Sequence, residues 1–193
     1  QESAIASEYE RMVAQGDEPT SAGSFGPYRI LRQLGSGGQG VVVLAEDTRL
    51  GRQVALKLLA PSLEFVSTER LQRFRREVEI LAQLDHPGIC AVFEADTIAQ
   101  MPYLAMRFVE GETLAAMLRT RREQGRLPQT RAEQHRVLGW IESAARALHE
   151  AHEAGVVHRD IKPGNLMVTP QDQPVILDFG LAQAADSEVQ ITR

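Results

Sequence analysis

Several short stretches of this 193-residue sequence gather polar residues that could carry chemistry. The densest is His158-Arg159-Asp160-Ile161-Lys162-Pro163-Gly164-Asn165, which lies between two apolar runs. A carboxylate, a cation two positions later and an amide five positions later could together serve a hydroxyl, a transferring phosphate and a metal ion. Asp178-Phe179-Gly180 follows another apolar run, and a carboxylate beside a flexible glycine is a ready Mg²⁺ ligand. The two stretches therefore predict phosphate and metal chemistry.

A glycine-rich stretch, Gly35 to Val42, fits the pattern G-x-G-x-x-G-x-V. The same pattern marks dinucleotide-binding folds, in which a helix begins directly after the glycines. Here three valines and a leucine follow, and these residues prefer extended structure. We therefore expect a strand–loop–strand flap whose backbone amides can cover phosphates, and a dinucleotide-binding fold is the disfavoured alternative.

Lys57, in the motif Val-Ala-Leu-Lys, lies in the middle of an apolar strand, and strand alternation places it on the same face as Ala55. A lone buried ammonium is costly, so we expect an acidic partner. Glu77 is the candidate, because it lies beside the apolar stripe of a helix predicted over 67–84. Such a pair could orient the ammonium at the α- and β-phosphates of a nucleotide. The alternative is a strand lysine whose amine reaches solvent.

The elements that must position these residues are of two kinds. Apolar and β-branched stretches predict strands over 28–34, 41–46, 53–59, 89–94 and 102–109. Helical spacing of apolar residues predicts helices over 67–84, 113–122 and 131–154. Thr130 and Glu133 form a capping box for the last helix, and Gly155 ends it. Short apolar runs follow at 156–157, 166–168 and 175–177.

Composition excludes several classes of protein. The chain is 43% hydrophobic and 24% charged, as in soluble globular proteins, and its net charge of −5 disfavours nucleic acid as a partner. The longest apolar run is too short to cross a bilayer, and we expect a cytoplasmic location. The single cysteine, Cys90, excludes an internal disulfide framework. Of 21 basic residues only Lys57 and Lys162 are lysines, which is notable because lysine and arginine are not interchangeable at a phosphate.

Taken in order, these motifs resemble the protein kinase superfamily, most of all the serine/threonine kinases, including the eukaryotic-like enzymes of bacteria. The resemblance implies an α+β fold with a small antiparallel β-sheet lobe, containing one helix, and a mainly helical lobe. Residues 1–24 would form an N-terminal helix and linker, 25–108 the ATP-binding lobe, and 109–193 part of the second lobe with the catalytic and metal-binding loops. The implied activity is transfer of the ATP γ-phosphate to a serine or threonine hydroxyl of a protein. The implied cofactor is Mg²⁺, with Mn²⁺ as an alternative.

The resemblance also implies a role for each matching residue. Asp160 would accept or orient the substrate hydroxyl, and Lys162 would steady the γ-phosphate. Lys57, held by Glu77, would contact the α- and β-phosphates. The implied metal ligands are Asn165 and Asp178. The implied nucleotide-binding residues are Gly35, Ser36, Gly37, Gly38, Gln39, Gly40, Val42, Ala55, Lys57, Met106, Val109 and Met167.

The sequence ends at Arg193, before the Ala-Pro-Glu motif that closes the activation segment in this family. We therefore expect a truncated catalytic domain, in which an incomplete second lobe exposes apolar surface and favours a homodimer. The alternative is a catalytically inactive, pseudokinase-like fragment that binds nucleotide or partners. The intact set of Lys57, Asp160, Asn165 and Asp178 favours a kinase, whereas the missing C-terminal part favours the alternative.

Overall fold

The computed structural model describes residues 23–37, 40–59, 76, 78–99, 101–125 and 130–179. They fall into two compact units. The first contains the described residues up to 82 together with 92–108, and the second contains 83–91 and the described residues from 109 onward. Among the described residues, we find no helix with the length and hydrophobicity needed to span a bilayer.

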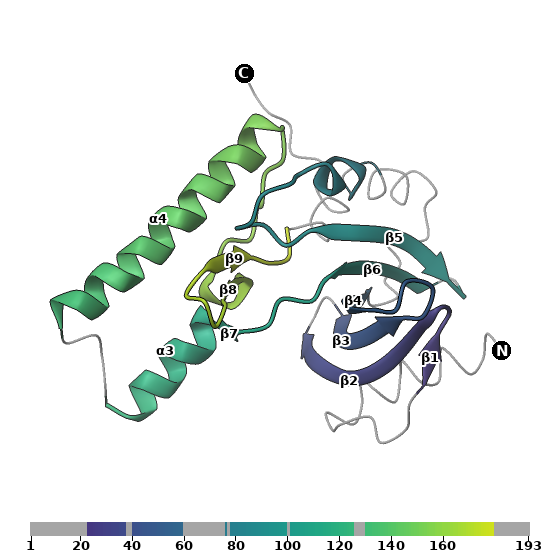
Figure 1. The fold of residues 1–193 in the computed structure, drawn as a ribbon, viewed down its shortest axis with the longest axis horizontal. Helices are drawn as coiled ribbons and strands as arrows, with labels where there is room; N and C mark the ends of the chain where they lie inside the picture. The colour runs from purple at the N-terminus through teal and green to yellow at the C-terminus, as the bar shows by residue number, and fades with distance from the viewer. Residues whose placement is uncertain are drawn as a thin grey trace. The chain divides into compact units, whose positions relative to one another are not determined.

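Within its described residues, the first unit is built on a six-stranded sheet with the order β1-β2-β3-β4-β6-β5 (Figure 1). Its strands are β1 (Ser24–Phe25), β2 (Tyr28–Gly37), β3 (Gly40–Asp47), β4 (Arg52–Leu59), β5 (Val92–Ile98) and β6 (Met101–Arg107). Every neighbouring pair in this sheet is antiparallel. The register of β2 shifts twice before its glycines, which bends the strand there.

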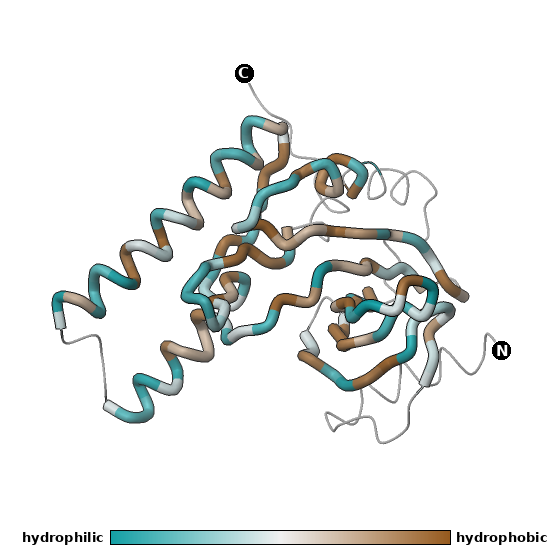
Figure 2. The backbone as a smooth tube through the Cα atoms, in the orientation of Figure 1, coloured by the Kyte–Doolittle hydropathy of each residue, from teal (hydrophilic) through white to brown (hydrophobic). Residues whose placement is uncertain are grey.

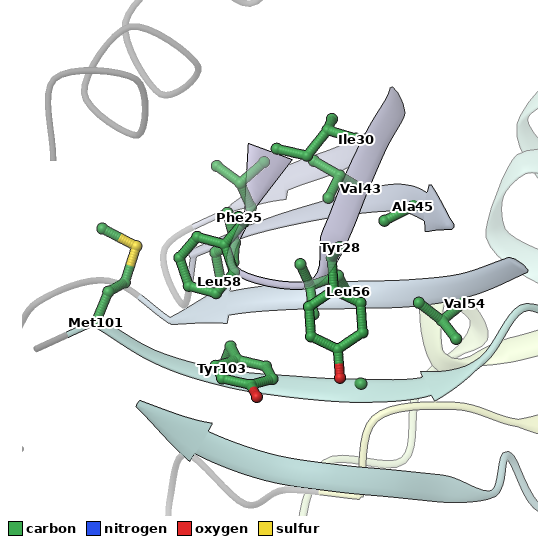
Figure 3. Close-up of a cluster of buried hydrophobic side chains, with 12 residues drawn as sticks. Phe25, Tyr28, Ile30, Val43, Ala45, Val54, Leu56, Leu58, Met101 and Tyr103 are labelled. Atoms are coloured by element: carbon green, nitrogen blue, oxygen red, sulfur yellow. The ribbon is translucent and has the colours of Figure 1, made fainter. Parts of the chain in front are cut away.

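The core of the first unit lies on one face of this sheet, because alternate residues of a strand point to the same side. Figure 3 shows these side chains converging from several strands. The ring of Tyr103 meets Phe25 and Tyr28 edge-on, with centroid distances of 5.4 and 5.6 Å. The cluster comprises Phe25, Tyr28, Ile30, Val41, Val43, Ala45, Val54, Leu56, Leu58, Met101, Tyr103 and Ala105.

The second unit contains a small sheet and two described helices. The sheet has the order β7-β8-β9, with β7 (Glu112–Thr113), β8 (Leu166–Val168) and β9 (Pro174–Ile176). The helices are α3 (Leu114–Glu123) and α4 (Arg131–Glu153), and a 3₁₀ turn, η2 (Pro163–Asn165), precedes β8. Figure 2 shows apolar residues recurring between hydrophilic ones along α4. The buried residues Leu114, Trp140 and Val168 join the helices to the sheet.

The ends of α4 are fixed by local sequence. The Thr130 hydroxyl accepts from the Glu133 N–H at 3.2 Å, and the Glu133 carboxylate accepts from the Thr130 N–H at 3.2 Å. This reciprocal capping box confirms the predicted start of the helix. Gly155 follows the helix with φ +82°, a conformation that glycine adopts without strain.

Most of the predicted strands and helices are present, with ends displaced by up to four residues. The strand predicted over 89–94 begins only at Val92, because Ile89 instead forms a bridge with Ile176. Ser24, which was expected in a linker, belongs to β1 and pairs with Arg29 of β2. The two-residue strand β7 was not predicted, and the run at 156–157 is not a strand.

Of the helix predicted over 67–84, positions 76 and 78–82 are helical, and 83–84 are not. The remainder of that helix lies outside the described residues, as do 1–22 and 180–193.

Candidate functional site

One face of the first unit's sheet gathers four of the candidate nucleotide-binding residues. Val42 lies opposite Lys57 in the β3–β4 pairing, and Ala55 lies opposite Met106 in the β4–β6 pairing. Because cross-strand partners project to the same side, and Ala55 and Lys57 are two residues apart on β4, all four share one face. Lys57 is only 7% exposed and is the charged member of this otherwise apolar set. The prediction that Ala55 and Lys57 share a face is confirmed.

The glycine-rich stretch connects two strands. Gly35, Ser36 and Gly37 are exposed at the end of β2, and β3 begins at Gly40. Gly40 has φ +134°, and a Cβ there would lie 2.0 Å from the Leu58 carbonyl oxygen, so only glycine fits. The predicted strand–loop–strand arrangement is confirmed, which excludes the helix that a dinucleotide-binding fold requires.

Asp160 is the centre of the polar cluster in the second unit. Lys162 Nζ donates to its Oδ2 at 2.6 Å, and Asn165 Nδ2 donates to its Oδ2 at 3.2 Å and to its backbone oxygen at 2.8 Å. The Lys162 hydrogen bond is the largest influence that holds the pKa of Asp160 below its ordinary value, and Asn165 acts in the same direction. Within the described part of the chain, Oδ1 of Asp160 accepts no hydrogen bond, which leaves this oxygen for a substrate group.

His158 links the loop around Asp160 to the segment that precedes Asp178. Its imidazole is buried, and Nδ1 accepts a hydrogen bond from the Asp160 N–H at 3.2 Å. The ring proton is therefore assigned to Nε2, which donates to the Leu177 carbonyl at 2.9 Å. The ring also packs against Phe179, with centroids 4.7 Å apart. This link was not predicted from the sequence, in which the only signal for it is a histidine between two valines and the Arg159-Asp160 motif.

Asn165 and Asp178 lie at the open end of the β8–β9 hairpin. Asn165 directly precedes β8, Asp178 follows β9 by two residues, and the Leu177 N–H donates to the Asn165 carbonyl at 2.8 Å. Both hydrogen bonds of the Asn165 side chain use Nδ2, so its Oδ1 remains as a potential ligand. An amide oxygen and a carboxylate are hard oxygen donors of the kind that Mg²⁺ prefers. The donor set therefore fits this cation.

Two of the loop residues have unusual backbone conformations. Arg159 has φ +62° and Asp178 has φ +48°, in the left-handed region that residues other than glycine seldom adopt. Strained residues of this kind persist where the surrounding structure holds them, and they concentrate at functional sites. The two conformations support the assignment of a site to these loops.

The remaining candidate residues either belong to the second unit or lie outside the described part of the chain. Val109 and Met167 belong to the second unit, where Met167 lies in β8 opposite Thr113 and Val175. Glu77, Gly38 and Gln39 lie outside the described residues.

With this geometry in place, comparison with known proteins decides the family. The sequence matches the protein kinase domain family over residues 28–193. The chain belongs to this family. The resemblance inferred from the motifs, and with it the predicted fold class, is confirmed.

Several curated relatives of this kinase domain are bacterial. It is 43% identical over 168 residues to serine/threonine-protein kinase PknA of Mycobacterium tuberculosis, covering 84% of this chain and 37% of the relative. It is 40% identical over 183 residues to the probable serine/threonine-protein kinase SCO3848 of Streptomyces coelicolor, covering 92% of this chain and 25% of the relative. The chain thus spans at most 37% of the length of these two relatives.

Solved structures agree on the fold. A kinase domain of M. tuberculosis PknI superposes with a TM-score of 0.70 at 29% identity, covering 84% of this chain and 62% of that one. The apo form of PpkA-294 gives a TM-score of 0.69 at 27% identity, with the same coverage of 84% and 62%. The chain is therefore a member of the protein kinase family that spans somewhat less than two thirds of these solved domains.

Proposed function

We propose that this protein transfers the γ-phosphate of ATP to a serine or threonine hydroxyl of a protein substrate. The observation that carries the proposal is the surroundings of Asp160, whose carboxylate is held ionised by Lys162 and Asn165 while Oδ1 stays available. The bacterial relatives are named as serine/threonine kinases, which supports the same substrate class. Because ATP is the donor, we expect the reaction in the cytoplasm.

In this proposal, Asp160 orients the substrate hydroxyl through Oδ1. A carboxylate with a lowered pKa is a weak base, so it accepts the hydroxyl proton late, once the bond to phosphorus is forming. This order suits a loose transition state, in which positioning and charge compensation contribute most of the catalysis. The ammonium of Lys162 is more than half exposed beside Asp160, where it can reach a γ-phosphate oxygen.

The Asn165 amide oxygen and the Asp178 carboxylate would hold a divalent cation, Mg²⁺ or in its place Mn²⁺. When bound, this ion neutralises phosphate charge. The contribution of the protein is to hold the two ligands on a hairpin whose open end is closed by the Leu177–Asn165 hydrogen bond.

The nucleotide would bind against the shared face of β3, β4 and β6. Val42, Ala55 and Met106 offer an apolar surface for the adenine ring, and Lys57, paired with Glu77, would contact the α- and β-phosphates. The exposed glycines of the flap leave open space for phosphates, since a Cβ at Gly35 or Gly37 would touch nothing within 4 Å. The proposal extends to Ser36, Gly38, Gln39, Gly40, Val109 and Met167 as further nucleotide contacts.

The expected homodimer stays a prediction. Apolar side chains on α4 are exposed, among them Leu138 at 60% and Ile141 at 52%, and such surface favours association.

The test is a phosphotransfer assay on the full-length gene product with a protein substrate, ATP and Mg²⁺. We expect Asp160→Asn to lower kcat by about a thousandfold, since a positioned base contributes roughly 10²–10⁴-fold. Calorimetry should find ATP·Mg²⁺ affinity within a few-fold of the wild type. Asp85→Asn makes the same chemical change at an exposed aspartate and should leave both quantities unchanged.

Two results would contradict the proposal. A wild-type protein that binds ATP·Mg²⁺ but phosphorylates nothing, itself included, would instead be the inactive nucleotide-binding alternative. A wild-type protein with no heat of ATP binding would overturn the nucleotide assignment altogether.

A further inference from the structure

The turn between β8 and β9 is fastened to helix α4 by one aspartate. Arg136 Nε donates to the two carboxylate oxygens of Asp172 at 2.8 and 2.9 Å, and the Trp140 indole N–H donates to Oδ1 at 3.0 Å. The Arg136 guanidinium also lies over the Trp140 ring, 5.0 Å from its centroid. We call Arg136, Trp140 and Asp172 the hairpin clasp.

The geometry of the hairpin clasp follows from helix and turn structure. Arg136 and Trp140 are four residues apart on α4, so they lie on one face of the helix. Asp172 has φ +65°, and its N–H donates to the Thr169 carbonyl at 2.9 Å within the tight turn. Aspartate tolerates this conformation better than most residues. Helix and turn thus present complementary groups at one point. Figure 1 shows the course of α4 and of strands β8 and β9.

The clasp is more than a surface ion pair. The side chains of Arg136 and Asp172 are 50% and 43% exposed, and an ion pair with that much solvent exposure contributes little to stability by itself. Trp140, however, is only 4% exposed and packs with Leu114 and Val168. Loss of the Asp172 acceptor would leave the indole N–H of a buried side chain without its partner, which costs more than an exposed pair gains.

The opposite end of the same hairpin carries the proposed metal ligands. Three-residue strands place the turn roughly 10 Å from Asn165 and Asp178. One edge of the hairpin pairs with β7, and on the other edge Ile176 bonds to Gly88 and Cys90 at 2.8 and 2.9 Å. These edges are short, so they fix the lateral position of the hairpin better than its tilt. The clasp fixes the closed end.

We propose that the hairpin clasp positions Asn165 and Asp178 for the divalent cation by holding the tilt and register of β8 and β9. The inference rests on the proposed function, since the metal role of these two ligands belongs to it. The three clasp residues are positioning residues that act through the strands. A one-residue slip of a strand turns every side chain to the other face, so a fixed register matters for both ligands.

The first test needs neither metal nor nucleotide. In the full-length protein, Asp172→Asn keeps the side-chain size and the tolerance for φ near +65°. It removes the charge and replaces one of the two acceptor oxygens by an NH₂ group, so a single oxygen is left for Arg136 and the Trp140 indole. We expect the amides of residues 166–168 and 175–177 to exchange with solvent at least about tenfold faster. Glu142→Gln is the matched control, because it breaks an exposed pair with Arg146 (2.8 Å) on the same helix, away from the hairpin.

A second measurement separates positioning from stability. Calorimetric ATP binding is titrated with Mg²⁺ well below the melting temperature. Asp172→Asn should raise the Mg²⁺ concentration at half-maximal binding about tenfold, as removal of groups that orient metal ligands does, and saturating Mg²⁺ should restore binding. Trp140→Phe removes the indole donor but keeps an aromatic ring, so it should shift the midpoint in the same direction by less.

The results of these two measurements distinguish a positioning role of the clasp from a structural one. A lower melting temperature with an unchanged Mg²⁺ midpoint would mean a structural role only and would overturn the inference, as would hairpin exchange equal to that of Glu142→Gln. If even the wild type lacks Mg²⁺-dependent ATP binding, the proposed function fails, and the exchange experiment still reports whether the clasp holds the hairpin.

Discussion

Replacement of His158 by phenylalanine tests whether one buried imidazole holds the two functional loops together. The variant keeps a ring of similar size against Phe179, so it opens no large cavity. It removes both hydrogen bonds of the imidazole: the one that Nδ1 accepts from the Asp160 N–H and the one that Nε2 donates to the Leu177 carbonyl. The Leu177 carbonyl then loses its partner, whereas the Asp160 N–H keeps its shorter hydrogen bond of 2.8 Å to the backbone carbonyl of residue 158.

The size of the effect follows from these two bonds. A buried polar group without a partner costs about 1–3 kcal/mol. The Leu177 carbonyl loses its hydrogen bond of 2.9 Å, whereas the bond that the Asp160 N–H loses is the longer of its two, at 3.2 Å, so we expect about 1–3 kcal/mol in total. At about 1.4 kcal/mol per tenfold, this corresponds to roughly 5- to 150-fold. Because Leu177 directly precedes Asp178, much of the loss should fall on kcat.

The assay combines phosphotransfer rates with hydrogen exchange of peptides that contain residues 158–160 and 177–179 of the full-length gene product. His149→Phe is the matched control, because His149 is exposed on α4 and its replacement should change neither quantity appreciably. A His158→Phe protein with kcat within threefold of the wild type and unchanged exchange in both peptides would refute the reasoning.

Two further predictions concern stability. Arg49 Nε donates to the buried Asp47 carboxylate at 3.0 Å, and this hydrogen bond holds the pKa of Asp47 below its ordinary value. A carboxylate of this kind stabilises the fold at pH values above its unfolded pKa of about 3.9. The stabilisation is lost as the pH falls through the pKa of the folded state. Asp47→Asn should therefore cost about 1–2 kcal/mol in urea unfolding at pH 7, and the difference from wild type should shrink in acid; a pH-independent difference would contradict this. Gly111→Ala would place a Cβ 2.3 Å from the Val168 carbonyl oxygen and should weaken the β7–β8 pairing by about 2 kcal/mol or more in hydrogen exchange. Gly139→Ala, which meets nothing within 4 Å on helix α4, should instead stabilise by about 0.5–1 kcal/mol, and equal effects of the two alanines would refute the steric argument.

The features that the sequence predicted well are local ones. The capping box at Thr130 and Glu133 depends on residues three apart, so both its hydrogen bonds follow from the sequence alone. The strand after the glycines depends on the extended preference of consecutive valines, which excluded the helix of a dinucleotide fold. The shared face of Ala55 and Lys57 follows from strand alternation.

The features that the sequence did not predict depend on distant partners. Ile89 looks like a strand residue, yet it bridges to Ile176, so β5 begins three residues later. The contact of Trp140 with Asp172 joins positions 32 apart and has no periodic pattern. The left-handed backbone at Asp172 has no sequence signal comparable to glycine, so the turn that aims its carboxylate at α4 could not be foreseen.

The left-handed residues of the two functional loops both lie next to hydrogen-bond partners of His158. A left-handed residue such as Arg159 costs on the order of 1–2 kcal/mol, and Asp178, of a residue type that tolerates the conformation better, adopts it as well. Each of them is adjacent in sequence to a hydrogen-bond partner of the imidazole, Asp160 in one loop and Leu177 in the other. One side chain thus contributes to holding both strained turns. A shift of either loop would strain or break the bond to the other, so we infer that the proposed hydroxyl-orienting residue and the proposed metal ligand move together through the imidazole.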